Sequence, residues 1–366
     1  MKKVLMVSCE GLGNGGVQNV MMNIVRNLNN KYLIDMLLFT NDRRYYDDEF
    51  ERIAGHIYRI PHYNGNNLLR KKIDYYIRGG VLYKEVYRIL SNNGPYSVVH
   101  CNNNYEGAII LKAAKAADVN VRIMHSHVIH QKGNFIVNRL NAVRRREISK
   151  FATKQIACSI EAAKSFYDAQ SEFYVVKNPF DDNIFRCLSP LQLQRPLELV
   201  QIGAFSDNKN QLYSAKVLLE IKKLYNNVKL NYIGFELENG YIEKVRCFIH
   251  ENGLDENVVF YKSDADRPQI LDSAAFLIHP SKNEGFGIVV IEAQAVGNVC
   301  FVSDSLPKEV NCGGCTFFSL NEKPSLVANM IIDEYKKNHG KHFLFDCNEF
   351  TSSTFINAVE DLYKGL

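Results

Sequence analysis

The fold class is decided at residues 2–28, which read KKVLMVSCEGLGNGGVQNVMMNIVRNL. This segment begins with an apolar run of strand length, passes through a cluster of glycines and ends with apolar residues at helical spacing. The order strand, loop, amphipathic helix is the repeating unit of a parallel sheet covered by helices on both faces. We therefore predict an α/β protein with doubly wound, Rossmann-like parallel sheets.

The same alternation returns along the chain. Further strand-like runs lie at 33–39, 96–101, 121–126, 154–159, 173–176, 197–203, 228–234, 257–261, 274–281 and 299–304. Helical patterns separate many of them, and a last helix-like stretch lies at about 351–364. Strands alternating with helices in this way predict parallel sheets.

Three prolines and little periodicity mark a linker near the middle of the chain. We predict a first domain at 1–178, a linker at 179–196, a second domain at 197–348 and a helix at 349–366 that packs back on the first domain. Two such domains create an interdomain cleft, and ligands of doubly wound sheets bind at the carboxyl ends of strands. Function is therefore sought in the loops that follow strands.

Composition excludes several classes of protein. The chain has 366 residues, of which 46% are hydrophobic and 23% charged, so disordered and fibrous classes do not fit. No apolar stretch is long enough for a membrane span, and the run after Met1 is too short for a signal peptide. Of nine cysteines, only Cys312 and Cys315 are closely spaced. We expect reduced thiols in the cytosol and no metal site.

Charge is unevenly distributed. Residues 1–180 contain 26 Lys and Arg against 15 Asp and Glu, whereas the remainder contains 18 against 25. A basic first half indicates an anionic partner, such as a phospholipid surface, a nucleic acid or a phosphorylated substrate.

The glycine cluster Gly11–Gly16 formally matches G-x-G-x-x-G between a strand and a helix. Against a dinucleotide site, three residues separate the strand from the first glycine, and the only acidic candidate, Asp42, comes late. Glycines and the amides that open the helix can still approach an anion, here through Gly15 and Gly16. A turn without a ligand remains the alternative.

A second loop, EGFGIVVIE at 284–292, follows a strand and leads into a helix. Glu292 lies among apolar residues, where a carboxylate is costly unless it is hydrogen-bonded, and the paired hydroxyls of a ribose would supply that bonding. Glu284 precedes the helix and can accept from sugar hydroxyls. A pair of solvated glutamates is the alternative, which explains Glu284 better than Glu292. The backbone amides that face donor oxygens belong to Gly285, Phe286, Gly287 and Ile288.

The chain resembles the retaining glycosyltransferases of the GT-B fold, family four, which make bacterial capsules and exopolysaccharides. EGFGIVVIE is similar to the E-x7-E motif of that family. Weaker landmarks agree in order: GNGGVQNVMMNIVRNL at 13–28, RIMHSH at 122–127, ACSIEAAKSF at 157–166, VVKNPFD at 175–181, QIGAFSDNKNQ at 201–211, LNYIGFE at 230–236 and VSDSLPKEV at 302–310. The resemblance implies a nucleotide-sugar donor on the second domain and an acceptor on the first.

The resemblance also implies roles for single residues of the second domain. Glu292 would bind the donor ribose, Glu284 the sugar ring near the reacting carbon, and Lys209 the diphosphate beside Gly203. The family usually has an arginine where this chain has Ala204. One of two expected cations is therefore missing, and Lys262 or Lys282 are the candidates to replace it.

Two histidines follow a strand of the first domain in the stretch HSH. The resemblance places a histidine here near the donor sugar, where an imidazole can donate to a hydroxyl or a phosphate oxygen. A structural histidine is the alternative. We expect only one of the two to face the site and favour His125, with His127 and Asn14 as acceptor or second contacts.

Two basic stretches, 68–90 and 138–150, interleave cations with apolar residues, and the second contains Arg144–Arg146. Aromatic residues among the cations of the first suit an interfacial helix on anionic lipid. A solvated helix face is the plain alternative. Nucleic acid is not expected, because no binding module accompanies the charge.

Together these features predict a glycosyltransferase that moves a hexose or N-acetylhexosamine from a nucleotide-diphosphate sugar, UDP in our reading, to a lipid-linked or growing bacterial glycan. The resemblance implies retention of configuration, no cofactor and no metal. We place the protein in the cytoplasm, peripheral on the inner face of the cell membrane. The alternatives are a sugar-nucleotide epimerase of the same fold and an inactive donor-binding partner subunit, the latter suggested by Ala204.

Overall fold

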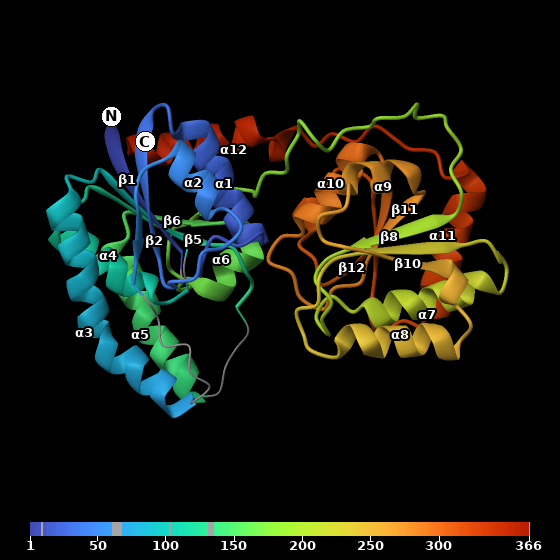
Figure 1. The fold of residues 1–366 in the computed structure, drawn as a ribbon, viewed down its shortest axis with the longest axis horizontal. Helices are drawn as coiled ribbons and strands as arrows, with labels where there is room; N and C mark the ends of the chain where they lie inside the picture. Colours follow the sequence, from blue (N-terminus) through green and yellow to red (C-terminus); the bar gives the residue numbers. More distant parts are fainter. Residues whose placement is uncertain (9, 61–67, 103, 131–134, 366) are drawn as a thin grey trace. The chain divides into compact units, whose positions relative to one another are not determined.

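The protein is described by a computed structural model that covers residues 1–8, 10–60, 68–102, 104–130 and 135–365, with the side chains of 68–78 and 136 outside the description. The chain divides into two compact units (Figure 1). Unit 1 comprises Met1–Asn178 and Ser353–Leu366, and unit 2 comprises Pro179–Ser352. Each unit is built on a parallel sheet, so the predicted α/β fold class is confirmed. The segment 179–196, which we predicted as a linker, is part of unit 2.

Unit 1 contains a seven-stranded sheet in the order β3-β2-β1-β4-β5-β6-β7, with every pairing parallel. Its strands are β1 (Lys2–Ser8), β2 (Tyr32–Leu38), β3 (Ile57–Arg59), β4 (Val98–Asn102), β5 (Val121–Ser126), β6 (Lys154–Ala157) and β7 (Tyr174–Val175). Its helices are α1 (Gly16–Leu28), α2 (Asp47–Ile53), α3 (Leu68–Asn93), α4 (Gly107–Ala116), α5 (Phe135–Phe151), α6 (Ile160–Phe166) and α12 (Ser352–Lys364).

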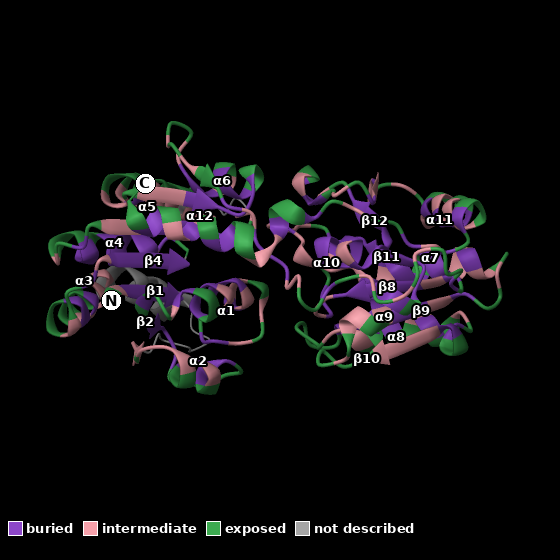
Figure 2. Ribbon diagram, turned by 90° about the horizontal axis from the view of Figure 1, so that it is seen from above, coloured by how far each residue is buried: buried purple, intermediate pink, exposed green. Residues whose placement is uncertain are grey.

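The central strands are apolar without alternation because helices cover both faces of the sheet. Val4, Leu5, Met6 and Val7 of β1 are all fully buried. Figure 2 shows the strands of unit 1 as a buried layer, with exposed positions on the outer faces of the helices. Polar residues follow the apolar ones at the ends of the strands, where the candidate site lies.

The last helix, α12, completes unit 1 after the chain has formed unit 2. Figure 1 shows α12 beside the first elements of the chain, with both termini in this unit. The Tyr363 ring meets Tyr32 edge-on at 5.4 Å, and Lys31 pairs with Glu360 at 2.7 Å. A segment more than 300 residues away in sequence thus packs against β2 and its approach.

Unit 2 contains a six-stranded parallel sheet in the order β10-β9-β8-β11-β12-β13. Its strands are β8 (Glu198–Ile202), β9 (Lys229–Ile233), β10 (Val258–Tyr261), β11 (Phe276–His279), β12 (Val299–Ser303) and β13 (Cys315–Phe318). Its helices are α7 (Gln211–Lys222), α8 (Tyr241–Glu251), α9 (Arg267–Ser273), α10 (Ile288–Val296) and α11 (Pro324–Asn338), with short 3-10 turns η1 (Asp255–Asn257), η2 (Lys308–Val310) and η3 (Asn348–Phe350).

The core of unit 2 is rich in aromatic rings. Tyr232 and Phe260 lie 5.5 Å apart between ring centres, and Phe276 meets Phe301 edge-on at 5.5 Å. The edge-on arrangement of Phe276 and Phe301 is a favourable one for aromatic rings. In the part of the chain that is described, no helix is long and apolar enough to cross a membrane.

Candidate functional site

The strand order of unit 2 changes direction between β8 and β11, which pair in parallel. Loops that leave the two strands at such a point diverge and open a crevice for ligands. The two loops stay in contact here: Lys282 N donates to Asn208 O at 2.8 Å, and Asn208 Nδ2 donates to Asn283 O at 2.9 Å. The loop that carries Lys209 therefore lies against the loop that carries Glu284.

Glu284 is the centre of a polar cluster in unit 2. Its Oε1 accepts hydrogen bonds from Lys209 Nζ, from His279 Nε2 at 3.0 Å and from Ser281 Oγ at 3.2 Å. The Glu284 side chain is 14% exposed and that of Lys209 is 24% exposed, so water retains access to the pair. The structure therefore brings the predicted sugar-binding carboxylate and the predicted diphosphate-binding cation together.

The charges of this cluster are set by its own members. Burial opposes ionisation of Glu284, but the ammonium of Lys209 and the hydrogen bond from His279 outweigh it and hold the pKa of Glu284 well below its usual range. Burial lowers the pKa of His279, against the opposite effect of Glu284, so this imidazole is neutral at pH 7. The site contains an ionised carboxylate, a cation and a neutral histidine.

The loop after β8 is shaped by close backbone approach. Gly203 has φ of +152°, and a Cβ on Gly234 would lie 2.2 Å from Gly203 O. The buried Gln211 side chain donates to the carbonyls of Gly203 and Ala204 at 3.3 and 3.1 Å. These contacts fold the loop back so that the Lys209 side chain runs beside Gly203, as a Cβ there would meet Lys209 Cδ at 3.4 Å.

Glu292 lies on α10 and is 6% exposed. Its Oε2 accepts from Arg267 Nη1 at 3.1 Å, and the Arg267 guanidinium lies 5.0 Å from the centre of the Phe185 ring. Burial raises the pKa of Glu292, and Arg267 offsets that shift only in part. The buried carboxylate that we predicted is present, and Arg267 is a partner that no sequence pattern indicated.

The turn before α10 contains the two glycines of the stretch EGFGIVVIE. Gly287 has φ of +103° and immediately precedes Ile288, the first residue of the helix. Phe286 is buried, with its ring 5.9 Å from that of Phe350. Gly285 and Gly287 thus frame an anchored aromatic ring and leave the amides of the turn at the same strand end as Glu284.

In unit 1 the strand order changes direction between β1 and β4, and three buried histidines lie in the middle of β4 and at the end of β5. His100 Nε2 lies 3.2 Å from His125 Nδ1, and His127 Nε2 lies 2.8 Å from Asn102 Oδ1. Burial above all lowers the pKa of His100 to about 3 and that of His127 to about 4, and it holds the pKa of His125 well below its usual value. The cluster is therefore neutral at pH 7.

Our argument that strand alternation turns His125 and His127 to different sides is wrong. The two ring centres are 3.8 Å apart. Side chains alternate along a strand, so residues two apart point to the same face rather than to opposite faces. Among the described residues, neither His125 Nε2 nor His127 Nδ1 has a hydrogen-bond partner.

The glycine-rich loop of unit 1 is tied to the loop after β2. Tyr46 N donates to Leu12 O at 2.8 Å, and the Tyr46 hydroxyl lies 3.3 Å from Asn14 Oδ1. Gly16 opens α1, and a Cβ on Gly16 would meet nothing within 4 Å. At Gly15 a Cβ would meet only Gln18 Oε1 and Cδ within 4 Å. The space beside Gly16 is therefore open, whereas the Gln18 side chain lies against Gly15. Cys9, which precedes this loop, lies outside the described residues.

The basic residues are less free than the sequence suggested. Arg144 pairs with Glu147 at 2.6 Å, and Arg145 donates to Ser165 O at 2.7 Å, so these two are held by the protein itself. Arg146 is exposed. The side chains of Arg70, Lys71, Lys72 and Arg78 lie outside the described residues.

Neither substitute cation that we considered is placed at Ala204 by a contact. Lys282 Nζ pairs with Asp207 at 2.7 Å, and Lys262 is exposed. Lys209 is therefore the cation that the described contacts place in this polar cluster.

Two further features lie away from these clusters. Cys187, Asp272 and His342 are close enough to share a metal ion, but Asp272 already accepts from Ser189 and pairs with Arg195 at 3.8 Å. Resident hydrogen bonds and a resident guanidinium make this group a poor metal site.

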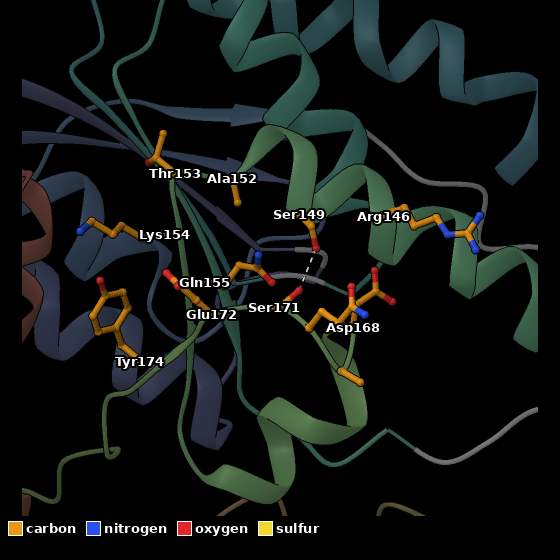
Figure 3. A pocket seen from close by; sticks show the side chains of 12 residues that line it. Arg146, Ser149, Ala152, Thr153, Lys154, Gln155, Asp168, Ser171, Glu172 and Tyr174 are labelled. Atoms are coloured by element: carbon orange, nitrogen blue, oxygen red, sulfur yellow. Dashed lines mark hydrogen bonds between the residues drawn. The ribbon is translucent and has the colours of Figure 1, made fainter.

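A polar cavity of about 710 Å³ lies near the start of β6 in unit 1 and includes Lys154 and Glu172 (Figure 3). It is at the amino end of the strand, opposite to the edge at which ligands of such sheets bind.

Sequence reasoning missed His279 and Arg267. His279 ends the apolar run of β11, two residues before Ser281, and its position at a strand end next to the motif was a usable signal. Arg267 is the first residue of α9, and nothing in its spacing links it to Glu292.

Comparison with known proteins is consistent with this architecture. Residues 190–314 match the family model described as glycosyl transferases group 1. The chain is 27% identical over 349 residues to the protein of Bacillus subtilis (strain 168) named "Putative glycosyltransferase EpsF", covering 90% of this chain and 87% of that one. It is 24% identical to the capsular polysaccharide biosynthesis glycosyltransferase CapH of Staphylococcus aureus, covering 73% and 76%.

Among solved structures, HepE of Anabaena in complex with UDP is similar over the whole of both chains, with a TM-score of 0.78 and 18% identity. Its complex with UDP-glucose gives a TM-score of 0.77, again over both whole chains and at 18% identity. The fold and the family match define the protein as a glycosyltransferase with the GT-B fold. The stretch that matches the group 1 family model lies within unit 2.

Proposed function

We propose that this glycosyltransferase moves a hexose or N-acetylhexosamine from a UDP-sugar to a lipid-linked or growing capsular or exopolysaccharide glycan, with retention of configuration. The observation that carries the proposal is the contact between Lys209 and Glu284 where β8 and β11 end. A cation beside a carboxylate at that edge matches a donor with an anionic diphosphate and a hydroxylated sugar. UDP is supported by the complexes of HepE, and the class of product by the name of CapH.

Donor binding would exchange partners within the cluster. Lys209 leaves Glu284 for the diphosphate, and Glu284 accepts from sugar hydroxyls while His279 and Ser281 continue to hold its Oε1. Glu292 accepts from the ribose hydroxyls, because Arg267 alone does not offset the burial of its carboxylate. The absence of a side chain at Gly203 leaves room for the diphosphate. The backbone amides of 285–288 would face the oxygens of the donor.

We further propose that no divalent ion takes part. Lys209 and the backbone amides at the start of α10 supply positive potential for the leaving diphosphate, which is the role that a metal would otherwise fill. Turnover that is unchanged by a chelator supports this proposal, and turnover restored only by added Mg²⁺ or Mn²⁺ contradicts it.

Unit 1 would hold the acceptor, through the loop at Asn14 and the histidines His125 and His127. Its basic surface, with Arg146 on α5, would associate with the anionic inner face of the cell membrane. Transfer to a membrane-embedded acceptor explains an excess of cations in residues 1–180.

The test is release of free UDP from UDP-glucose and UDP-N-acetylglucosamine, with and without a lipid-linked glycan acceptor. A transferase releases UDP in proportion to the acceptor consumed, and the coupling constant of the new anomeric proton in NMR reports retention. An epimerase would change the donor without an acceptor. Donor binding without turnover on any acceptor would identify a binding subunit, for which Ala204 is the motivating departure.

A further inference from the structure

Three polar side chains from distant segments form a line through the core of unit 1. Tyr363 of α12 lies with its hydroxyl 2.9 Å from His100 Nδ1, and His100 Nε2 lies 3.2 Å from His125 Nδ1. The His100 and His125 rings are stacked, with centres 5.3 Å apart. The line ends at His125 Nε2, which has no hydrogen-bond partner in the part of the chain that is described.

All three side chains are shielded from solvent. His100 and His125 are fully buried, and Tyr363 is 1% exposed. Water is not at hand to satisfy their polar atoms, and a buried donor without an acceptor carries the full cost of its desolvation. The direction of the hydrogen bonds therefore matters to the free energy of this core.

A neutral imidazole has one N–H and one accepting nitrogen, so the line can run in only two directions. In the first, the Tyr363 hydroxyl donates to His100 Nδ1, His100 Nε2–H donates to His125 Nδ1, and His125 carries its proton on Nε2. In the second, His125 and His100 both carry their protons on Nδ1, and Tyr363 accepts.

The second direction leaves two groups unsatisfied. Among the described residues, His100 is the only hydrogen-bond partner of the Tyr363 hydroxyl, so its own proton would lack an acceptor, and His125 Nε2 would also be unpaired. The first direction leaves only the His125 Nε2–H. Fewer unsatisfied buried groups favour the first direction.

We propose that Tyr363 and His100 are positioning residues for His125, which fix the tautomer in which His125 presents an N–H donor at Nε2. This inference rests on the proposed function, in which His125 faces the bound substrates. A fixed donor suits a hydroxyl or phosphate oxygen of those substrates and would not suit an N–H group. A side chain of α12 thereby sets the chemistry of a histidine at the end of β5.

The test uses the full-length protein labelled with ¹⁵N-histidine, and long-range ¹H–¹⁵N correlation shows which ring nitrogen carries each proton. We expect His100 and His125 both to be protonated on Nε2. Protons on Nδ1 of both rings would overturn the proposal.

Two variants distinguish the effect of the Tyr363 hydroxyl from that of the ring contact between α12 and β2. Tyr363→Phe keeps the ring and removes the donor, so a measurable share of both histidines should move to the Nδ1 tautomer. Tyr32→Phe removes a hydroxyl from the ring that packs on Tyr363 and should leave both tautomers unchanged. Wild-type tautomers in Tyr363→Phe, or equal shifts in both variants, would show that Tyr363 does not set the direction.

Activity gives a second, independent measurement. With UDP-glucose as donor, Tyr363→Phe should lower kcat several-fold with an unchanged KM for the donor, and Tyr32→Phe should match the wild type. His100→Gln keeps an N–H donor toward His125 Nδ1 and should retain more turnover than His100→Phe, while equal losses would contradict the positioning role. If UDP-glucose is neither bound nor turned over, the proposed function fails while the tautomer result still decides the inference.

Discussion

The two units share a parallel-sheet topology but carry different polar clusters at, or one strand beyond, the point where the strand order reverses. In unit 2 the ends of β8 and β11 bring together an ammonium, a carboxylate and an imidazole, with Glu284 at the centre. In unit 1 the middle of β4 and the end of β5 bring together neutral imidazoles, among them His100 and His125. Parallel sheets dictate where the two clusters lie, and the side chains decide what each can bind.

The difference lies in how each cluster satisfies its own polar groups. The charged groups of unit 2 neutralise one another, so a ligand with a negative and a hydroxylated part can replace each partner in turn. The neutral groups of unit 1 form a fixed line that leaves His125 Nε2 unpaired. In the proposed function, the charged cluster exchanges partners when the donor binds, whereas the neutral line keeps its internal hydrogen bonds.

The largest expected effect follows from removing the charge at the centre of the unit 2 cluster. Glu284→Gln should lower kcat on the order of 10²–10³-fold, the usual cost of removing one preorganised electrostatic contact to a reacting group. UDP affinity should change little, because the contact is to the sugar. Equal losses of affinity for UDP and UDP-glucose would show that Glu284 contacts the nucleotide and not the sugar.

The second carboxylate of the motif should act on affinity instead. Glu292→Gln should weaken binding of UDP by about 1.5–3 kcal/mol, the value of a hydrogen bond to a charged group. Glu243→Gln, on the exposed face of α8, is the control and should bind UDP as the wild type does. Unchanged affinity of folded Glu292→Gln would remove the ribose assignment.

The two glutamates should also affect stability with opposite dependence on pH. The lowered pKa of Glu284 stabilises the fold above the unfolded value of about 4.3, and this contribution is lost as the pH falls through the lower folded pKa. The raised pKa of Glu292 makes its ionisation a cost that grows as the pH rises above about 4.3.

Thermal unfolding of both variants between pH 3 and 7 measures this contrast. Glu284→Gln should be less stable than the wild type at pH 7 and approach it at acid pH. Glu292→Gln should be at least as stable as the wild type at pH 7. If both variants were less stable than the wild type at pH 7, or both more stable, the predicted contrast would be contradicted.

The smallest effect concerns the membrane. Reversing the exposed Arg146 and Lys150 of α5 to Glu should weaken binding to anionic vesicles by about 1 kcal/mol for each cation removed from the surface. Reversing Lys336 and Lys337 of α11 makes the same charge change in unit 2 and should leave binding unchanged. Equal losses in both variants would show that overall charge, rather than α5, drives the association.

Much of the fold was predictable because both units alternate buried apolar strands with helices. The run predicted at 121–126 is β5 to the residue. Two short edge strands, β3 and β13, escaped prediction. Strands of three and four residues with few buried side chains leave little periodic signal.

The candidate site was partly predictable for a related reason. Glu284 and Lys209 both follow strands, and the carboxyl ends of parallel strands meet at one edge of a sheet, so their proximity was foreseeable. The line from His100 to Tyr363 was not, because 263 residues separate the two and no spacing rule connects them. The partnership of Glu292 with Arg267 depends likewise on helix packing that the sequence does not encode locally.

The central claim is that the diphosphate of a UDP donor is held by Lys209. Calorimetric titration of UDP into wild-type, Lys209→Ala and Lys282→Ala protein tests it directly, since Lys282 is an exposed cation that contacts the same loop through Asp207. We expect the Lys209→Ala affinity to fall at least 10-fold, from the loss of a charge-assisted hydrogen bond, while Lys282→Ala stays near the wild type. UDP affinity in folded Lys209→Ala equal to that of the wild type would contradict the claim.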